Sequence, residues 1–542
     1  MNDAILSVKD LRTYFHTEEG TVKSVDGLTF DVAPGEILAL VGESGSGKSV
    51  SALSILRLIQ SPPGEIVSGE IWFDGQDILS ITEEEMRALR GNDLAMIFQE
   101  PMTSMNPVLT VGRQVAEPLE VHQGIKPSKA LQRAADLLNQ VHIADAEIRA
   151  ASHPHQFSGG MRQRAMIAMG MGCDPKLMIA DEPTTALDVT TQAQILKLIN
   201  EMQAMHKSGV LFITHDFGVV ADIADRVAVM QYGRVVETGT VDKVLNAPEH
   251  PYTQALISSV PSLVPRASRP RSEEIVLSGQ KIEKSFGGGK SLFGFGKPNR
   301  FVHAVKDVTL ELRRGETLGV VGESGSGKST LARCIIRLLD SNSGKIMLDG
   351  TDIGSLGRSE MRPFRAKIQM VFQDPFASLN PRIKVGQIIS QGPIIQGEPK
   401  ERAEARAREL LKIVGLDERA FKRYPHEFSG GQRQRIGIAR ALALDPEILV
   451  ADEPVSALDV SIQAQILKLL DEIREKMNLS MLFITHDLRV AAQVCDRLAV
   501  MRYGELVETG ATKDIFDSPK HSYTRDLLAA VPGQNWDRTT AV

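Results

Sequence analysis

Two copies of one glycine-rich segment carry the clearest chemistry in this chain. GESGSGKS occurs at residues 42–49 and again at 322–329, each time after an apolar run and before a helical pattern. Such a loop lets backbone N–H groups close around phosphate oxygens, and the following helix N-terminus adds positive potential. Its lysine then reaches the β and γ phosphates, and its final serine binds Mg²⁺. The residues expected to contact a nucleotide such as ATP are Gly42, Glu43, Ser44, Gly45, Ser46, Gly47, Lys48 and Ser49, and Gly322, Glu323, Ser324, Gly325, Ser326, Gly327, Lys328 and Ser329.

A pair of carboxylates ends a buried strand in each half of the chain, in LMIADEP and ILVADEP. Strand ends of this kind lie at the rim of an α/β sheet, where ligands bind. We expect Asp181 and Asp452 to hold Mg²⁺, with Ser49 and Ser329 as further ligands. Glu182 and Glu453 are then the expected general bases that polarise the attacking water.

A histidine and a glutamine also follow strands in each half. His215 and His486 lie in the repeated LFITHD, where each ends a strand, and Gln99 and Gln373 follow AMIF and QMVF. An uncharged amide there can ligate Mg²⁺ or orient water without adding charge. All four side chains are therefore predicted to belong to the catalytic sites, with both glutamines as additional metal ligands.

A third repeated segment opens a helix with a serine and two glycines, in HQFSGGMRQR and HEFSGGQRQR. This is a second anion-binding helix N-terminus, which one nucleotide does not need from the same half. We therefore predict that each half offers this turn to the nucleotide of the other. The residues concerned are Ser158, Gly159 and Gly160, and Ser429, Gly430 and Gly431.

These motifs recur in the same order, so the chain of 542 residues consists of two collinear halves. We predict a first domain at residues 1–260, a linker at 261–274 and a second domain at 275–542. The linker is rich in Pro, Ser and Arg and is predicted to be solvated. A further loop, Gly287 to Phe301, interrupts the second half and is predicted to be a hairpin tip or a contact to a membrane or partner.

The predicted fold is α/β, with two tandem phosphate-loop domains. Apolar runs such as EILALVG alternate with helical patterns such as KSVSALSILRLI, as in parallel α/β sheets. Between Gln99 and Ser158 the pattern becomes helical. Each half is therefore predicted to be an α/β core with a helical subdomain and a C-terminal tail.

Composition limits the other possibilities. The net charge of −6 argues against nucleic-acid binding, and no apolar stretch is long enough to cross a membrane. The N-terminus does not resemble a signal peptide, so we expect a cytoplasmic protein. Cys173, Cys334 and Cys495 lie far apart without zinc-type spacing.

Taken together, the glycine loop, glutamine, SGGQ, ADEP, SALD and ITHD resemble the ATP-binding-cassette (ABC) ATPases over nearly the whole chain, twice. The resemblance implies a head-to-tail pairing in which the first loop works with Ser429 and Gly431 and the second with Ser158 and Gly160. It also implies an aromatic residue under the adenine, matching Phe15, with Tyr14 as neighbour, and Phe286. Met161 replaces the usual glutamine and TALD replaces SALD in the first half, and we expect both sites to be competent.

The tails APEHPYTQALISSVP and SPKHSYTRDLLAAVP resemble those of the oligopeptide, dipeptide and nickel importer branch. This resemblance implies peptide import by a motor peripheral to the cytoplasmic face of the bacterial membrane. The implied partners are two integral-membrane permease subunits, docked on residues 102–118 and 376–393, and an extracytoplasmic solute-binding protein. No iron–sulfur cluster is expected, because no cysteine follows Cys495.

Three alternative functions were compared with the sequence, and only a change of cargo stays open. The cargo could be nickel, glutathione, a peptide-like antibiotic or a sugar. A soluble tandem cassette acting on ribosomes usually has a long charged helical linker, and a DNA-repair cassette has zinc-type cysteines or coiled coils. Neither feature is present here.

Overall fold

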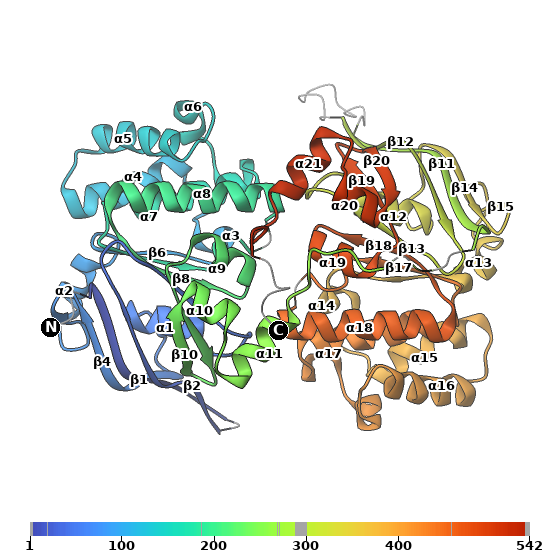
Figure 1. The fold of residues 1–542 in the computed structure, drawn as a ribbon, viewed down its shortest axis with the longest axis horizontal. Coiled ribbons are helices and arrows are strands. Elements are labelled where there is room, and N and C mark those ends of the chain that lie inside the picture. The colour runs from blue at the N-terminus through green and yellow to red at the C-terminus, as the bar shows by residue number, and fades with distance from the viewer. Residues whose placement is uncertain are drawn as a thin grey trace. The chain divides into compact units, whose positions relative to one another are not determined.

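The computed structural model describes residues 4–18, 20–185, 187–267, 269, 272–287, 301–456 and 458–536. The chain divides into two compact units, one of Met1–Val260 with Val531–Val542 and the other of Pro261–Ala530. Figure 1 draws both units. The predicted loop at 287–301 falls at 288–300 outside the described residues.

The first unit contains two sheets. One has the strand order β2-β1-β4-β5 and is antiparallel, and the other has the order β10-β9-β3-β8-β7-β6. In the second sheet every neighbouring pair is parallel except β9 with β10. The strands are β1 Leu6–Thr17, β2 Gly20–Val32, β3 Ile37–Val41, β4 Gly64–Phe73, β5 Gln76–Asp77, β6 Leu94–Ile97, β7 Leu177–Asp181, β8 Gly209–Thr214, β9 Arg226–Gln231 and β10 Arg234–Thr240.

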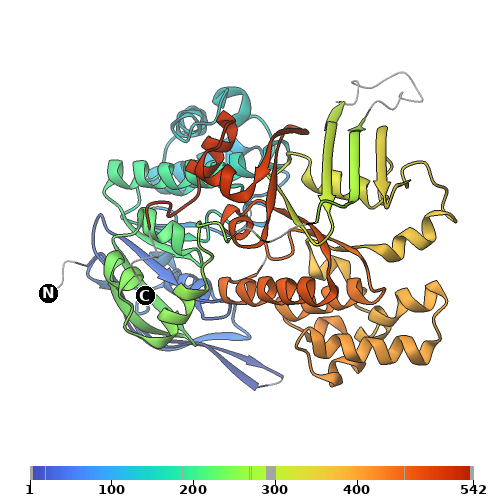
Figure 2. The same ribbon diagram turned by 45° about the vertical axis from the view of Figure 1, so that its right-hand side comes forward.

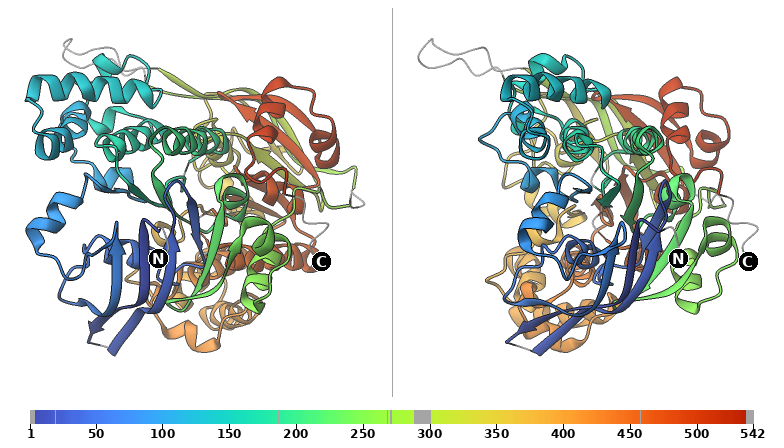
Figure 3. Two further views of the ribbon diagram at one scale, coloured as in Figure 1. Left: turned by 60° about the vertical axis from the view of Figure 1, so that its left-hand side comes forward. Right: turned by 90° about the vertical axis from the view of Figure 1, so that its left-hand side faces the viewer.

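Helices cover this sheet and form a separate helical insert. The insert and the antiparallel sheet lie at opposite ends of the first unit (Figures 1 and 3). The insert comprises α3 Pro101–Ser104, α4 Val111–Gln123, α5 Pro127–Gln140, α6 Ala146–Ala150, the 3₁₀ turn Pro154–Gln156 and α7 Gly159–Met171. The other helices are α1 Lys48–Ile55, α2 Glu83–Leu89, α8 Val189–His206, α9 Phe217–Ile223, α10 Val241–Asn246 and α11 Pro251–Ser259.

The second unit repeats this plan, with sheets ordered β12-β11-β14-β15 and β16-β17-β18-β13-β19-β20. Figure 2 shows its antiparallel sheet and its helical insert at opposite ends of the unit. The strands are β11 Ile275–Phe286, β12 Val302–Arg313, β13 Thr317–Val321, β14 Ser343–Leu348, β15 Thr351–Asp352, β16 Ile368–Val371, β17 Ile448–Asp452, β18 Ser480–Thr485, β19 Arg497–Arg502 and β20 Glu505–Ala511. The helices are α12 Lys328–Ile335, α13 Met361–Lys367, α14 Pro375–Ser378, α15 Val385–Gln396, α16 Lys400–Ile413, α17 Gly430–Leu442, α18 Val460–Met477, α19 Leu488–Val494, α20 Thr512–Asp517 and α21 Ser522–Ala529.

The central strands explain why the site is rigid. All five residues of β3, β7, β13 and β17 are buried, as expected of parallel strands covered on both faces. Fully buried Leu38, Leu40, Ile179 and Ile213 share one core cluster with Leu6 of the antiparallel sheet. The carboxyl ends of β3, β7 and β8 are therefore held together by a packed core, and the functional side chains follow these ends.

Two arginines in the segment predicted to be a linker, residues 261–274, form ion pairs within the second unit. The guanidinium groups of Arg266 and Arg269 bind the carboxylates of Asp471 and Asp496, with N–O distances of 2.8–3.3 Å. Both arginine side chains are only 19% exposed. The aspartates that these arginines bind lie more than two hundred residues away in sequence, so local composition could not indicate the pairing.

The chain's last described segment belongs to the first unit rather than to the second half. The N–H of Gly533 donates to Asp222 Oδ2 at 2.9 Å, and Trp536 Nε1 donates to Asn246 Oδ1 at 3.1 Å. This division differs from the predicted second domain at 275–542. Among the described residues, no helix combines the length and apolar character needed to span a membrane.

Candidate nucleotide sites

The first glycine loop joins buried β3 to α1 in a conformation that only glycine permits at its tightest points. Gly47, the N-cap of α1, has φ 103°, and a Cβ there would lie 2.1 Å from the carbonyl oxygen of Ser24. Gly42 has φ 155°, and its Cβ would lie 2.3 Å from Met230 O. The glycines at these positions are therefore required by backbone packing as well as by ligand approach.

Inside this loop the lysine is held by backbone carbonyls. Lys48 Nζ donates to the carbonyl oxygens of Gly42 and Glu43 at 2.8 and 2.9 Å. Lys328 makes the same two bonds in the second loop, at 2.7 and 2.8 Å. Each ammonium group therefore lies within its own loop, where it can exchange carbonyl contacts for phosphate oxygens.

Buried hydroxyls in both loops support anion binding. The Oγ atoms of Ser46 and Ser326 are buried, and neither has a hydrogen-bond partner among the described residues. A buried hydroxyl without a partner costs free energy, so an acceptor brought by a ligand would remove that cost. Loop geometry, lysine and free hydroxyl donor together fit a phosphate group.

Each loop's final serine contacts the strand-end aspartate. Ser49 Oγ lies 3.0 Å from Asp181 Oδ1, and Ser329 Oγ lies 2.8 Å from Asp452 Oδ1. The described residues contain no group of three or more His, Cys, Asp or Glu side chains that could cage a metal. One hydroxyl and one carboxylate fit Mg²⁺, which commonly keeps waters and takes its other ligands from phosphates.

Glu182 follows Asp181 at the end of β7, and the other predicted side chains form hydrogen bonds with its carboxylate. Gln99 Nε2 donates to Glu182 Oε2 at 2.8 Å, and His215 Nδ1 lies 3.0 Å from Oε1. The hydroxyl of Thr185 donates to Oε2 at 2.9 Å. Glu182 has φ 44°, which is unusual for a residue with a side chain and typical of functional sites. The geometry brings together the glutamine, glutamate and histidine that sequence had predicted.

Burial and ion pairing move the two neighbouring carboxyl groups in opposite directions. Burial raises the pKa of Asp181 to about 6, supported by the charge of Glu182 and opposed by the Ser49 hydrogen bond. Burial would raise the pKa of Glu182 too, but the hydrogen bond and charge of His215 outweigh it and lower that pKa to about 2. Because Glu182 is ionised, the histidine Nδ1–H is the donor, and the bond raises the pKa of His215 despite its burial.

The second half repeats this cluster with two differences, one in the oxygen that the histidine approaches and one in the partner of the nearby hydroxyl. Gln373 Nε2 donates to Glu453 Oε2 at 2.9 Å, and His486 Nδ1 lies 3.2 Å from the same oxygen. The pKa of Glu453 is lowered and that of Asp452 is raised, burial opposing the first shift and causing the second. The hydroxyl of Ser456 donates to the backbone carbonyl of Glu453 and not to its carboxylate.

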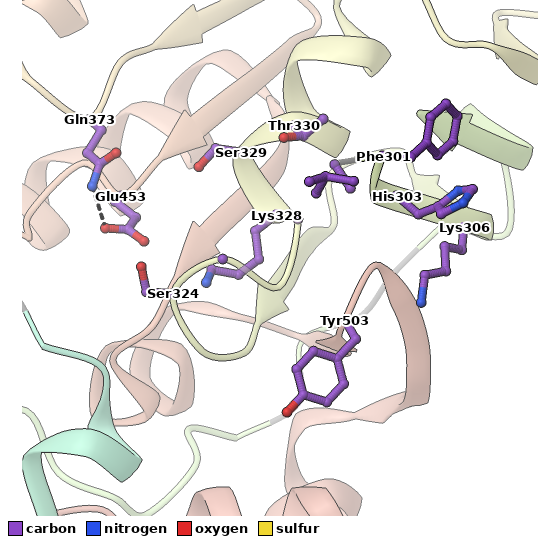
Figure 4. Close-up of a pocket in the computed structure, with 14 residues that line it drawn as sticks. Phe301, His303, Lys306, Ser324, Lys328, Ser329, Thr330, Gln373, Glu453 and Tyr503 are labelled. Atoms are coloured by element: carbon purple, nitrogen blue, oxygen red, sulfur yellow. Dashed lines mark hydrogen bonds between the residues drawn. The ribbon is translucent and has the colours of Figure 1, made fainter. Parts of the chain in front are cut away.

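A cavity of about 670 Å³ adjoins the second loop. Figure 4 shows Gln373 and Glu453 at one end, Lys328 in the middle, and Phe301 and His303 at the other end. This volume suits a nucleotide-sized ligand. Sequence analysis missed the residues at the far end, which are Phe301, His303, Lys306 and Tyr503.

The two aromatic residues predicted to contact adenine, Phe286 and Phe15, do not line this cavity. Phe286 ends β11 opposite Val302, which lines the cavity, but Phe286 itself is not among the lining residues. Its ring is 43% exposed and lies beneath the ammonium group of Lys284, 5.4 Å from the ring centroid. Phe15 is half-buried on β1, paired with Val22 on one side and Gly64 on the other. Both aromatic contacts stay predictions.

The two Ser-Gly-Gly segments cap helices as predicted but differ in detail. Ser158 is the N-cap of α7, and its Oγ accepts from Met161 N at 3.3 Å. Ser429 caps α17 through a reciprocal pair, because Gln432 Oε1 also accepts from Ser429 N at 3.1 Å. Both serines are exposed. The contact of each serine with the phosphate loop of the other half stays a prediction.

Comparison with known proteins identifies the class. The chain matches the family model described as ABC transporter at residues 25–185 and 305–456. It matches the model described as oligopeptide/dipeptide transporter, C-terminal region, at residues 236–289 and 507–541. The chain therefore belongs to the ABC transporter family, and each half is one ATP-binding cassette.

Relatives extend this match over nearly the whole length. The Peptidoglycan transport ATP-binding protein YejF of Agrobacterium fabrum is 49% identical over 97% of this chain and 96% of its own. The Glutathione import ATP-binding proteins GsiA of Salmonella typhimurium and Escherichia coli O157:H7 are 47% and 46% identical, over 97% of this chain and 89% of theirs. This chain is an ATP-hydrolysing subunit of a transporter, and it carries two ATP-binding cassettes.

Proposed function

We propose that this chain hydrolyses ATP at two sites to drive import of peptides or peptide-like solutes across the bacterial cytoplasmic membrane. The observation that carries the proposal is the oligopeptide/dipeptide transporter C-terminal region, which follows both cassettes. The family match supplies the ATPase, and this repeated region supports the choice of cargo class.

At the first site, Lys48 and the loop amides bind the β and γ phosphates. Ser49, Asp181 and Gln99 would hold Mg²⁺, which when bound neutralises phosphate charge. Glu182, ionised and oriented by Gln99 and His215, polarises the attacking water.

At the second site the corresponding residues have the same roles. Lys328 binds phosphate, Glu453 polarises water, and His486 and Gln373 orient Glu453. The metal ligands there would be Ser329, Asp452 and Gln373. Ser158 with Gly160, and Ser429 with Gly431, complete the sites crosswise, so that hydrolysis requires both cassettes.

Two permease subunits and an extracytoplasmic binding protein are the proposed partners, with the chain peripheral on the cytoplasmic face. The docking surfaces are residues 102–118 and 376–393, which follow the two glutamines. Exposed apolar side chains support this assignment, since Met102, Val108 and Phe376 are 53%, 76% and 60% exposed. Exchanging the two segments should abolish coupling, and unchanged assembly and coupling would refute the assignment.

The relatives narrow the cargo to three chemical classes for testing. Their names mention peptidoglycan and glutathione, and the tail model mentions oligopeptides and dipeptides. All three carry peptide bonds, which is why peptides are preferred here to nickel or sugars.

The test is ATPase activity of the chain reconstituted in liposomes with its permease pair and binding protein. The binding protein is supplied empty or loaded with a dipeptide and oligopeptide mixture, with glutathione, or with peptidoglycan fragments. Stimulation by a loaded over an empty binding protein, lost in the Glu182→Gln/Glu453→Gln chain, supports the proposal. Stimulation by nickel alone would support the ATPase assignment and reject peptides as the cargo class.

A further inference from the structure

The tail helix of each cassette reaches back to that cassette's phosphate loop through one tyrosine hydroxyl. The hydroxyl of Tyr252, on α11, accepts a hydrogen bond from the backbone N–H of Glu43 at 3.2 Å. The hydroxyl of Tyr523, on α21, accepts from the backbone N–H of Glu323 at 3.1 Å. The same contact therefore occurs independently in both cassettes.

The loop residue that is held in this way also holds the phosphate-binding lysine. The carbonyl oxygen of Glu43 accepts from Lys48 Nζ at 2.9 Å, and that of Glu323 accepts from Lys328 Nζ at 2.8 Å. The tyrosine thus fixes the N–H of a residue whose C=O positions the lysine. In the first cassette the tyrosine hydroxyl also donates to Glu43 Oε2 at 3.5 Å.

The tyrosines are themselves held by a repeated cap on the tail. The carboxylate of Glu237, on β10, accepts from the N–H groups of Glu249 and His250 at 2.8 and 3.0 Å. The ring of His250 then accepts from the N–H of Tyr252 at 3.2 Å. These bonds fix the start of α11, so the phenol reaches the loop from a rigid support.

The second cassette repeats this cap. Glu508, on β20, accepts from the N–H groups of Lys520 and His521 at 2.8 and 3.1 Å, and His521 accepts from the N–H of Tyr523. Tyr523 is 3% exposed, and the Arg502 guanidinium lies 4.6 Å from its ring centroid.

We propose that Tyr252 and Tyr523 are positioning residues for ATP binding, through which the tail sets the geometry of the phosphate loop. This rests on the proposed ATP-binding roles of Lys48 and Lys328. Without the hydroxyl, the loop N–H loses this acceptor, and the peptide that carries it is held by one hydrogen bond fewer. The tail that marks this transporter branch is therefore part of the nucleotide site and not only a clasp on the core.

The test is the chain carrying Tyr252→Phe and Tyr523→Phe, which keeps both rings and removes both hydroxyls. ATP affinity is measured by equilibrium binding of radiolabelled ATP in the Glu182→Gln/Glu453→Gln background, and KM and kcat are measured in the otherwise unchanged chain. We expect Kd and KM for ATP to rise about three- to tenfold, the usual effect of losing one hydrogen bond, with kcat at saturating ATP within twofold. Thermal unfolding is followed in parallel, and its midpoint should change little.

The matched control is Ser259→Ala, which deletes another hydroxyl on α11 whose bond, to Ala255 O at 2.8 Å, stays within the helix. It should leave Kd and KM unchanged. Unchanged Kd and KM in the double tyrosine variant overturn the inference, as does a fall in kcat or thermal midpoint at constant KM. A background chain that binds no ATP overturns the proposed function, and this inference with it.

Discussion

The two cassettes share the eight residues of the phosphate loop but differ in the hydrogen bonds to the glutamates that we propose as general bases. In the first cassette the carboxylate of Glu182 accepts from Gln99, His215 and the hydroxyl of Thr185. In the second, the hydroxyl of Ser456 turns to the backbone carbonyl of Glu453 instead. Threonine and serine differ by one methyl group, and the two glutamate carboxylates accept different sets of hydrogen bonds.

The helices that follow the phosphate loops also differ beside the strand-end aspartate. Arg333, on α12, is among the groups that oppose the burial-driven rise in the pKa of Asp452. The first cassette has Leu53 at the equivalent place on α1, and the pKa of Asp181 is raised to about 6. Identical motifs thus lie in different electrostatic surroundings, and we expect the two sites to hydrolyse ATP at unequal rates.

The largest effect on ATPase activity is expected when each glutamate is replaced in turn by glutamine. Glu182→Gln and Glu453→Gln keep shape but lose the negative charge that polarises water, an effect of about 10²–10⁴ on the rate of the altered site. We expect the double variant to lose more than 99% of steady-state ATPase activity, and each single variant to lose at least about half. Phosphate release assays on the reconstituted complex measure this.

Equal residual ATPase rates in the two single variants would contradict the expectation that the two sites hydrolyse ATP at unequal rates. A single variant with full activity would contradict the assignment of that site as competent.

A smaller effect is expected from the hydroxyls beside the glutamates. Thr185→Val deletes one of three hydrogen bonds to the carboxylate of Glu182, and the bonds from Gln99 and His215 remain. We therefore expect kcat to fall about two- to tenfold. Ser456→Ala deletes a bond to a backbone carbonyl and should change kcat less than twofold. The two variants are matched because each removes one hydroxyl at the same motif position, and the reverse order of effects would reject this account.

Anchoring of the segment between the halves gives a third test. Arg266→Ala/Arg269→Ala removes the guanidinium groups that bind Asp471 and Asp496, leaving carboxylates without these partners. Losing such partly buried pairs costs about 1–3 kcal/mol. We expect faster proteolysis between residues 261 and 274 and a lower thermal midpoint.

Arg419→Ala is the control for that experiment, since the Arg419 side chain is 90% exposed and its ion pair with Asp417 should contribute little. Equal cleavage rates in the anchored and unanchored chains would show that the arginines do not hold the segment.

Local sequence was sufficient to predict the fold class and to name the side chains that meet at Glu182, for physical reasons. Fully buried strands require continuous apolar runs, and the phosphate loop requires glycine where a Cβ would meet a backbone oxygen, as at Gly47. Because β7 and β8 are neighbours, residues that follow them had to lie together, as Glu182 and His215 do.

Other features depend on pairings that no local pattern encodes. The bonds from Arg266 to Asp496 and from Tyr252 to Glu43 join residues about two hundred positions apart. Likewise, Phe301 and His303 line the cavity only because β12 lies across from the phosphate loop. The repeated tyrosine in both tails was the one signal that could have suggested a functional contact.

The smallest expected effect lies at the first turn of α7, where the two cassettes differ by one side chain. Gln432 completes a reciprocal cap with Ser429, whereas Met161 cannot accept a hydrogen bond from the N–H of Ser158 in this way. Met161→Gln should therefore stabilise the start of α7 by about 0.5–1 kcal/mol, and Gln432→Met should destabilise α17 by a similar amount. Hydrogen exchange of the first-turn amides measures both effects. We expect slower exchange in Met161→Gln and faster exchange in Gln432→Met.

Because the serine hydroxyl and glycine amides are unchanged, KM for ATP should stay within twofold in both variants. A large change in KM at this position would mean that the side chain after Ser-Gly-Gly contributes directly to nucleotide binding, and the two cassettes would then differ in their ligand contacts as well as in their catalytic surroundings.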